Sequence, residues 1–516
     1  MTRRSVAIAA PNEVSAQAGA TIAEAGGNAV DAALASVIAA SVTEPGIVSP
    51  MGGAFINVWA PGGEPIVIDG NVEMPGRSRS RDDFGQGLER IDLDYGGGVT
   101  VHGGHGSVAT PGFFAAAGHA SRTWGALPWA QLMTPAIQAT RHGYPLGTSA
   151  AYYLGVSSTL FTWHPQTRAF VTQNGTVSPP PAGHLMRSPA LADTLELIAR
   201  DGIETLYTGE LARLIAADMA AHGGLLGLDD LAAYRVELRT PLRTELADWD
   251  IAVNPPPSIG GPVLMAMLRV LAERPAHTPA DLIEVQRLVL AYRRHHLDYS
   301  ADLAAAGTEL LRIISDEGPA GLRAMRSSPD TVHVSAVDAD GLICSVTTSA
   351  GYGSGVTVPG TGLMLNNTLG EPELNRRGLH AFDPGERLPS NMAPTTARRP
   401  DGTALAIGSP GADRITTALF QVLVALCLNG EGLQAAIDHP RLHVAFDAAD
   451  QPHLEHEDGP GLREAAHASG LPWRTHEEIT MYFGGVGAAL RHPDGHLEAA
   501  ADPRREAATA ISEPAV

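Results

Sequence analysis

The sequence is poor in cysteine and contains no long apolar run. Its 516 residues include two cysteines, Cys344 and Cys427, which are too few for a disulfide framework. Each lies in an apolar stretch, LICSV or VALCLNG, and this setting predicts a thiol buried in the core. No stretch of 18 apolar residues occurs, so a membrane-spanning helix is not expected.

Basic residues are few relative to acidic ones. The chain has 35 Lys and Arg against 56 Asp and Glu, which gives a net charge of −21. Nucleic acids and anionic membranes bind basic surfaces, so neither is expected as a partner. One or two local arginines could still hold a small anionic substrate. The opening MTRRSVAIAAPNE has too short an apolar run for a secretory signal, so we expect a cytoplasmic protein.

Apolar residues are plentiful by contrast. Hydrophobic residues make up 44% and charged residues 18% of the chain, which is typical of a globular protein with a large core. A length of 516 residues allows about two to four domains. Near the start, Gly26-Gly27 separates two Ala-rich helices, and Asn28 is the expected N-cap of the second, with Asp31 in its first turn.

The order of the predicted elements indicates the fold class. Helical patterns predominate before Thr331, and strands predominate after it. Strands are expected at 331–338, 342–349, 362–366, 393–399 and 404–408, followed by a helix at about 413–429. Because strands and helices come in blocks, we expect antiparallel sheets with helices packed outside, an α+β arrangement.

One predicted hairpin carries an unusual cluster of hydroxyl groups. The turn DADG (338–341) fits a three-residue loop in which Gly341 takes a positive φ. In that register Thr331 lies opposite Ser349 and His333 lies opposite Thr347. Side chains alternate faces along a strand, so these four residues share one face.

Two interpretations of this face are open. The first is an ordinary ladder of strand hydroxyls. The second is an N-terminal nucleophile, in which the free α-amine of a threonine acts as the base for its own hydroxyl. An internal Thr331 gains that amine only if the chain breaks after Asp330. Attack of the Thr331 hydroxyl on the Asp330 carbonyl would give an ester, and water would complete the cut.

A series of motifs along most of the chain favours the second interpretation. The chain resembles the γ-glutamyltranspeptidase family of N-terminal nucleophile hydrolases. The motifs, in order, are AGGNAVDAALA (25–35), EPG…GGAF (44–55), TPGFFAA (110–116), WGALPWAQLMTPAI (124–137), GGLLGLDDLAAY (223–234), PPPSIGG (255–261), TVHVSAVDADG (331–341), GSGVTVPGTGLMLNN (353–367), LPSNMAPT (388–395), GSPGADRI (408–415) and ADPRR (501–505).

The resemblance implies a four-layer αββα sandwich of two stacked, mainly antiparallel sheets. It also implies autocatalytic cleavage between Asp330 and Thr331. The products would be a large subunit 1–330 and a small subunit 331–516, which remain one intertwined heterodimer and one structural domain. A higher oligomer of the processed unit is compatible with the resemblance. No cofactor is expected.

The same resemblance assigns roles to individual residues. Thr331 matches the nucleophile, and Ser349 falls where the family has a threonine that orients it. Gly411 and Ala412 match the backbone N–H donors of an oxyanion hole. Arg81 matches the arginine that holds a substrate carboxylate, and Ser390 matches a serine that contacts the same group. Thr347, on the nucleophile's face, is counted with the substrate-binding residues.

The pocket that recognises a glutamyl group departs from the family pattern. Gly351 replaces an asparagine, Thr368 a glutamine, Glu371 an aspartate that takes the substrate ammonium, and Asn391 a serine. The segment from 371 to 390 is also short, which predicts an open cleft. Because a site that hydrogen-bonds a polar group discriminates strongly for it, these losses argue against glutathione as the best substrate.

Several functions stay open at this point. The leading hypothesis is an acyl hydrolase or acyltransferase that acts on an amide, or another acyl bond, of a small carboxylate-bearing substrate. The alternatives are a true γ-glutamyltransferase or glutathione hydrolase, a C–C bond hydrolase of secondary metabolism, and an unprocessed, non-catalytic homologue. A metal site is not expected, because His102 and His105 lie in a Gly-rich loop without an evident third ligand.

Overall fold

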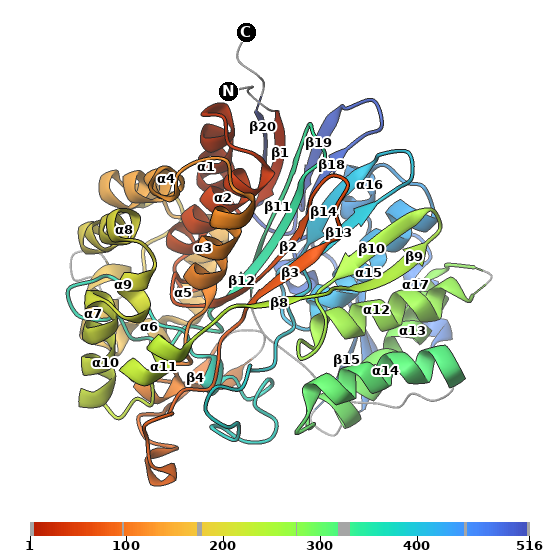
Figure 1. Cartoon of the computed structure of the whole chain (residues 1–516). Helices are drawn as coiled ribbons and strands as arrows, with labels where there is room; N and C mark the ends of the chain where they lie inside the picture. The colour runs from red at the N-terminus through yellow and green to blue at the C-terminus, as the bar shows by residue number, and fades with distance from the viewer. Residues whose placement is uncertain are drawn as a thin grey trace.

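The computed structural model describes residues 5–94, 98–172, 178–274, 276–317, 331–447 and 451–512. Two antiparallel sheets lie at its centre, with helices on both outer sides (Figure 1). Among the residues described, no helix combines the length and the apolar character that crossing a membrane requires.

The first sheet has seven strands in the order β20-β1-β11-β12-β2-β3-β8. Their bounds are β1 Val6–Ala10, β2 Gly53–Trp59, β3 Ile66–Gly70, β8 Glu237–Arg239, β11 Val332–Asp338, β12 Ile343–Ser349 and β20 Ala508–Ser512. Strands β11 and β12 follow residue 330 and lie between β1 and β2, which precede it. The expected boundary at 330 therefore does not divide the fold into two structural units.

The second sheet has six strands in the order β19-β18-β14-β13-β10-β9. Their bounds are β9 Leu242–Leu246, β10 Trp249–Val253, β13 Thr395–Arg398, β14 Ala404–Gly408, β18 Gly487–Arg491 and β19 Leu497–Ala501. This sheet faces the first across a thin layer that includes Ala7, Val337, Ile343 and Ala406. The small side chains let the two sheets approach each other closely.

Helices cover the outer face of each sheet (Figure 1). The first sheet is covered by α1 Glu13–Glu24, α2 Ala29–Thr43 and α3 Phe113–Trp124, with α4 Trp129–His142 and α8 Pro189–Asp201 packed outside them. The second is covered by α12 Gly260–Ala272 and α15 Arg414–Leu423, with α13 Pro279–Tyr292 and α14 Leu303–Glu317 alongside. The four-layer sandwich is confirmed.

Smaller elements surround these layers. The helices are α5 Thr148–Val156, α6 Ser158–Thr162, α7 Pro165–Val171, α9 Glu204–Tyr207, α10 Glu210–Ala221, α11 Leu228–Ala233, α16 Leu433–Asp438 and α17 Leu462–Ala468. The strands are β4 Glu89–Leu93, β5 Val99–Gly103, β6 Tyr144–Pro145, β7 Leu185–Met186, β15 Leu442–Phe446, β16 Pro452–Glu457 and β17 Trp473–His476. Short helical turns are η1 Arg81–Asp83, η3 His105–Ser107, η4 Arg293–Leu297, η6 Thr368–Gly370, η7 Val424–Leu428 and η8 Met481–Phe483.

Local predictions near the start of the chain are confirmed. The Asn28 side chain accepts hydrogen bonds from the backbone N–H groups of Val30 and Asp31, at 3.0 and 3.1 Å. The Asp31 carboxylate accepts in return from the Asn28 N–H at 3.0 Å. This reciprocal capping box starts α2 where the sequence predicts it. Cys344 and Cys427 are buried and unpaired, as expected.

One predicted strand is wrong. Residues 362–366 form isolated bridges, Thr357 with Met364 and Met51 with Leu365, and do not form a ladder. The chain folds back on itself here, because Gly360 and Gly362 both take positive φ values, 76° and 68°. The predicted helix at 413–429 is present as α15, which continues into the π-helical turn η7.

Candidate active site

The β11–β12 hairpin has the predicted register. Val332 pairs with Thr348 and His333 pairs with Thr347. The Asp338 N–H donates to the Leu342 carbonyl at 3.1 Å, and Gly341 has a φ of 86°. Thr331 immediately precedes β11 and Ser349 ends β12, so the register brings both to the same end of the hairpin. Asp330, the other side of the expected cleavage point, lies outside the described residues.

Thr331 and Ser349 open on one pocket with about 340 Å³ of space. Thr331 is 3% exposed. The remaining lining comes from the end of β3, from the segment after η6, and from the segment before β13. The lining residues are Asn71, Val72, Thr331, Ser349, Thr368, Glu371, Leu374, Pro389, Ser390, Asn391 and Met392. Four of the predicted substrate-binding residues, Thr368, Glu371, Ser390 and Asn391, are therefore brought together around the predicted nucleophile.

Two glycines let neighbouring strands approach this pocket. A Cβ atom at Gly52 would lie 2.3 Å from the Ser349 carbonyl oxygen. One at Gly53 would lie 2.9 Å from the Asn71 side-chain oxygen. Both separations are shorter than any ordinary van der Waals contact, so only glycine permits β2 to begin beside the hairpin end. The GGAF motif thus has a steric role in building the site.

Glu371 occupies space that a side chain at position 351 would need. Gly351 has a φ of 63°, and a Cβ there would lie 2.5 Å from the Glu371 carboxylate and 2.2 Å from the Asn367 side-chain oxygen. The loop that carries Glu371 is held by Asn375, whose side-chain N–H groups donate to the carbonyls of Thr368 and Glu371 at 2.7 and 2.9 Å. A side chain at position 351 and the Glu371 carboxylate in its present position therefore exclude each other.

Asn391 presents an amide without partners. Its side-chain nitrogen and oxygen are both buried, and neither has a hydrogen bond within the described residues. The backbone beside it is firmly held, because the Ser390 carbonyl accepts from the N–H groups of Ile259 and Gly260 at 2.9 and 3.1 Å. Buried amides are nearly always hydrogen-bonded, so this one is available for a ligand.

The charge of the pocket differs from the expectation. Among the described residues that line the pocket, Glu371 is the one with a carboxylate, and none is an arginine. Arg81, expected to hold a substrate carboxylate, does not line the pocket. Its guanidinium pairs with Asp383 and lies 4.6 Å from the Phe84 ring centroid, and its side chain is 55% exposed. A carboxylate-binding role for Arg81 stays a prediction that requires it to leave Asp383.

Thr347 is also placed away from the pocket. Its hydroxyl lies 2.9 Å from Nδ1 of His333, and Nε2 of His333 lies 2.7 Å from the Ser335 hydroxyl. All three side chains are buried between the two sheets. Burial lowers the pKa of His333 to about 3, so the imidazole is neutral at physiological pH. The Thr347 hydroxyl therefore contacts His333 on β11 in the layer between the two sheets. It does not line the pocket at Thr331.

The predicted oxyanion donors lie in the turn after β14. The end of β14 is close to the nucleophile's strand, because a Cβ at Gly408 would meet the His333 ring at 2.2 Å. Gly411 and Ala412 have φ values of 117° and 62°, which is unusual for alanine. Within the described residues their backbone N–H groups have no acceptor. Unpaired N–H groups are available as donors, but neither residue is in the pocket lining, so their role in an oxyanion hole stays a prediction.

Comparison with known proteins identifies the family. The family model described as gamma-glutamyltranspeptidase matches residues 15–512. The chain belongs to this family. Acylase ACY 1 proenzyme of Pseudomonas sp. (strain V22) is 31% identical, over 94% of this chain and 89% of its own length. The glutathione hydrolase proenzyme of Pseudomonas aeruginosa is 30% identical, over 96% and 93% respectively.

A solved structure agrees with this assignment. The crystal structure of a cephalosporin acylase from Bacillus halodurans has a TM-score of 0.82 and 26% identity, and covers 99% of this chain and 96% of that one. The protein is thus an enzyme of the gamma-glutamyltranspeptidase family, with the acylase or hydrolase activity of that family. Relatives at nearly equal identity bear the names of acylases and of glutathione hydrolases, so the substrate has to be argued from the pocket.

Sequence reasoning missed part of the pocket wall. Asn71, Leu374 and Met392 line the pocket but were not predicted. Met392 lies inside the motif LPSNMAPT (388–395), beside the predicted Ser390 and Asn391, and this proximity was the available signal. Asn71 lies in none of the motifs quoted above. Leu374 lies in the segment that departs from the family pattern, and no sequence signal marked it.

Proposed function

We propose that this enzyme is an N-terminal threonine hydrolase that cleaves itself before Thr331 and then hydrolyses an amide through an acyl-threonine intermediate. The observation that carries the proposal is the pocket at the end of the β11–β12 hairpin, with Thr331 and Ser349 both in its wall. Thr331 immediately precedes β11 and lies outside its ladder, so a new chain end can form there without breaking a pair of the β11–β12 ladder.

The Thr331 hydroxyl is the proposed attacking group in both maturation and turnover. In maturation the Thr331 hydroxyl attacks the Asp330 carbonyl, and the peptide C–N bond breaks to give an ester and the free α-amine of Thr331. Water then hydrolyses the ester to the Asp330 carboxylate and the Thr331 hydroxyl. In turnover that amine takes the hydroxyl proton as the oxygen attacks the substrate carbonyl, and returns it to the leaving amine. Water then releases the acyl group. The N–H groups of Gly411 and Ala412 are the proposed donors to the oxyanion.

The proposed substrate carries an ammonium group on its acyl part. Glu371 is 2% exposed and lies in the pocket wall, where its carboxylate can face an ammonium group on the acyl part of a substrate. A buried carboxylate is strongly favoured when an opposite charge faces it. The Asn391 amide supplies both a donor and an acceptor for a further polar group. Recognition of a substrate carboxylate by Arg81 would require the arginine to leave Asp383.

Self-cleavage can be tested by counting amines. The sequence contains no lysine, so the printed chain has a single primary amine, at its N-terminus. Cleavage before Thr331 adds one more. We expect an amine-specific acylating reagent to label the mature protein twice per 516 residues and a Thr331→Ala variant once, as measured by intact mass. A wild-type protein that stays a single band with a single label contradicts the proposal.

The substrate class can be tested with three anilides that share one leaving group. γ-Glutamyl anilide carries an ammonium and a carboxylate, 4-aminobutyryl anilide carries only the ammonium, and glutaryl anilide carries only the carboxylate. We expect both ammonium-bearing probes to exceed glutaryl anilide in kcat/KM, and Glu371→Gln to remove that preference. Fastest turnover of glutaryl anilide would refute the role of Glu371 and favour Arg81. The labelling test above keeps that result separate from failure to mature.

A further inference from the structure

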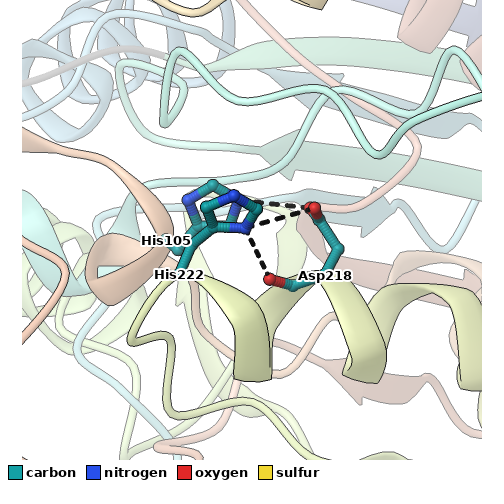
Figure 2. Close-up of side chains that lie close together, drawn as sticks. All are labelled: His105, Asp218 and His222. Atoms are coloured by element: carbon teal, nitrogen blue, oxygen red, sulfur yellow. Dashed lines mark hydrogen bonds and ion pairs between the residues drawn. The ribbon is translucent and has the colours of Figure 1, made fainter.

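Two histidines and an aspartate meet outside the lining of the pocket at Thr331. His105 lies in η3, and Asp218 and His222 are one turn apart on and just after α10 (Figure 2). Residues at this spacing share one helix face. No third ligand for His105 is evident in its own loop. Asp218 and His222, more than 100 residues away in sequence, bring a carboxylate and an imidazole beside it.

The distances in this His–Asp–His cluster suit metal coordination. Nε2 of His105 is 3.2 Å from one Asp218 oxygen, and Nδ1 of His222 is 3.4 Å from the other. One ligand atom from each of the three residues lies within 4.8 Å of the others. Two ligands bound to a tetrahedral ion at about 2.1 Å are about 3.4 Å apart. The His105 and His222 rings are stacked with their centroids 4.4 Å apart, and Nδ1 of His222 lies 2.9 Å from the Asp218 carbonyl oxygen. Both imidazoles would therefore have to turn toward the carboxylate to share an ion with it.

Burial explains why this carboxylate needs a cation. Asp218 is 9% exposed, and its side-chain partners among the described residues are the two imidazoles. Two other buried aspartates pair with arginine: Asp413 with Arg414, and Asp502 with Arg441. An imidazole compensates a buried carboxylate as an ion pair only when it is protonated. A bound divalent ion would neutralise Asp218 with both histidines in their neutral form.

A third imidazole stands beside the cluster. The His164 ring is edge-on to His105, with centroids 5.9 Å apart. Its Nδ1 is buried and has no hydrogen-bond partner within the described residues. The His222 side chain, by contrast, is 52% exposed, which leaves a path for an ion from solvent. The cluster thus combines buried ligands with an accessible side.

We propose that His105, Asp218 and His222 form a binding site for a divalent transition-metal ion of the zinc class. Two or three imidazole nitrogens with one carboxylate suit Zn²⁺, Co²⁺ or Ni²⁺, whereas Mg²⁺ and Ca²⁺ prefer oxygen ligands throughout. The site contains no nucleophile, and its role is to join η3 to α10. Because η3 packs against η6, where Thr368 lines the active-site pocket, the ion would hold one wall of that pocket in place.

Cobalt provides a direct test in the full-length protein. After removal of metals with a chelator, we expect one equivalent of Co²⁺ to bind and to give the strong visible absorption of a four-coordinate site. Asp218→Asn keeps the size of the side chain, and His222→Ala changes a half-exposed one, so both variants should fold. Each should bind Co²⁺ at least tenfold more weakly than the wild type.

A second His–carboxylate–His arrangement in the same chain supplies the matched control. Glu455 lies between His453 and His476, with nitrogen–oxygen distances of 3.5 and 2.6 Å. Among the described residues, however, the ligand atoms of His453, Glu455 and His476 do not all lie close enough together to hold one metal ion. His453→Ala should leave the Co²⁺ affinity within threefold of the wild type.

The proposal is overturned if the wild type binds no cobalt, if either Asp218→Asn or His222→Ala binds within tenfold of it, or if His453→Ala loses binding equally. The cluster would then be a hydrogen-bonded pair of imidazoles around a carboxylate. A readout in the wild type needs no variant: Zn²⁺ should protect His222 from an imidazole-modifying reagent by at least tenfold, measured by peptide mass. Unprotected His222 also overturns the proposal.

Discussion

His333 makes the stability of the nucleophile's strand depend on pH. Its ring is buried between the two sheets, two residues from Thr331. The Ser335 hydroxyl donates to the Gly487 carbonyl at 3.1 Å, so its oxygen accepts from Nε2–H of His333. Nδ1 is then unprotonated and accepts from the Thr347 hydroxyl. A proton can be added only to this nitrogen, in an interior where burial lowers the pKa to about 3.

The size of the effect follows from the two pKa values. In the unfolded chain an imidazole binds a proton below about pH 6.5, whereas folded His333 does not until about pH 3. Between these values the unfolded state binds more protons, so stability falls as the pH falls, by about 1.36 kcal/mol per pH unit. At pH 4.5, about two units below 6.5, the loss relative to pH 8 is roughly 2.7 kcal/mol.

Hydrogen exchange of β11 and β12 measures this loss segment by segment. We expect the opening free energy of these strands to fall between pH 8 and pH 4.5 by about 2.7 kcal/mol more in the wild type than in His333→Gln, which cannot take up the proton. Exposed His184 offers the control, since His184→Gln should behave as the wild type does. Equal losses in the wild type and His333→Gln would show that His333 is not the buried neutral base described above.

Three further predictions concern the pocket. Gly351→Asn, which restores the family residue, should lower kcat/KM for γ-glutamyl anilide instead of raising it, because the new side chain collides with Glu371; a gain would contradict the coupling of the two positions. Asn391→Ala should leave the melting temperature unchanged or higher, because two unsatisfied buried atoms disappear, while kcat/KM falls roughly tenfold; a variant that melts lower with full activity would argue for a structural role. Ala412→Gly should keep activity and raise stability by about 1 kcal/mol, because only its N–H acts and glycine accepts a φ of 62° without strain; lost activity would show that the methyl group matters.

Part of the site was predictable from sequence because it is local. The DADG turn sets the hairpin register, and the two-residue period of a strand then decides which side chains share a face. Thr331 and Ser349 meet for these reasons alone, 18 residues apart in the printed sequence. The cap of α2 at Asn28 is predictable for the same reason, since both capping partners lie within three residues.

Loop positions were less predictable. Family motifs located Glu371 and Asn391 near the nucleophile, but they did not show that Glu371 occupies the space vacated at Gly351. The motif at Arg81 suggested a ligand of the substrate, whereas the folded chain pairs it with Asp383, 302 residues further along. An exposed arginine takes the nearest carboxylate, and which carboxylate is nearest depends on the path of two separate loops.

The sequence by itself determined the family and the meeting of Thr331 with Ser349 at one end of the hairpin, because these depend on short-range order and on motifs with strict spacing. Only the tertiary structure decided the charge of the pocket and the meeting of His105 with Asp218 and His222. Those contacts join segments more than 100 residues apart, and their geometry is set by how helices and loops pack around the sheets. The pattern of apolar residues within a single segment does not indicate which distant segment will pack against it.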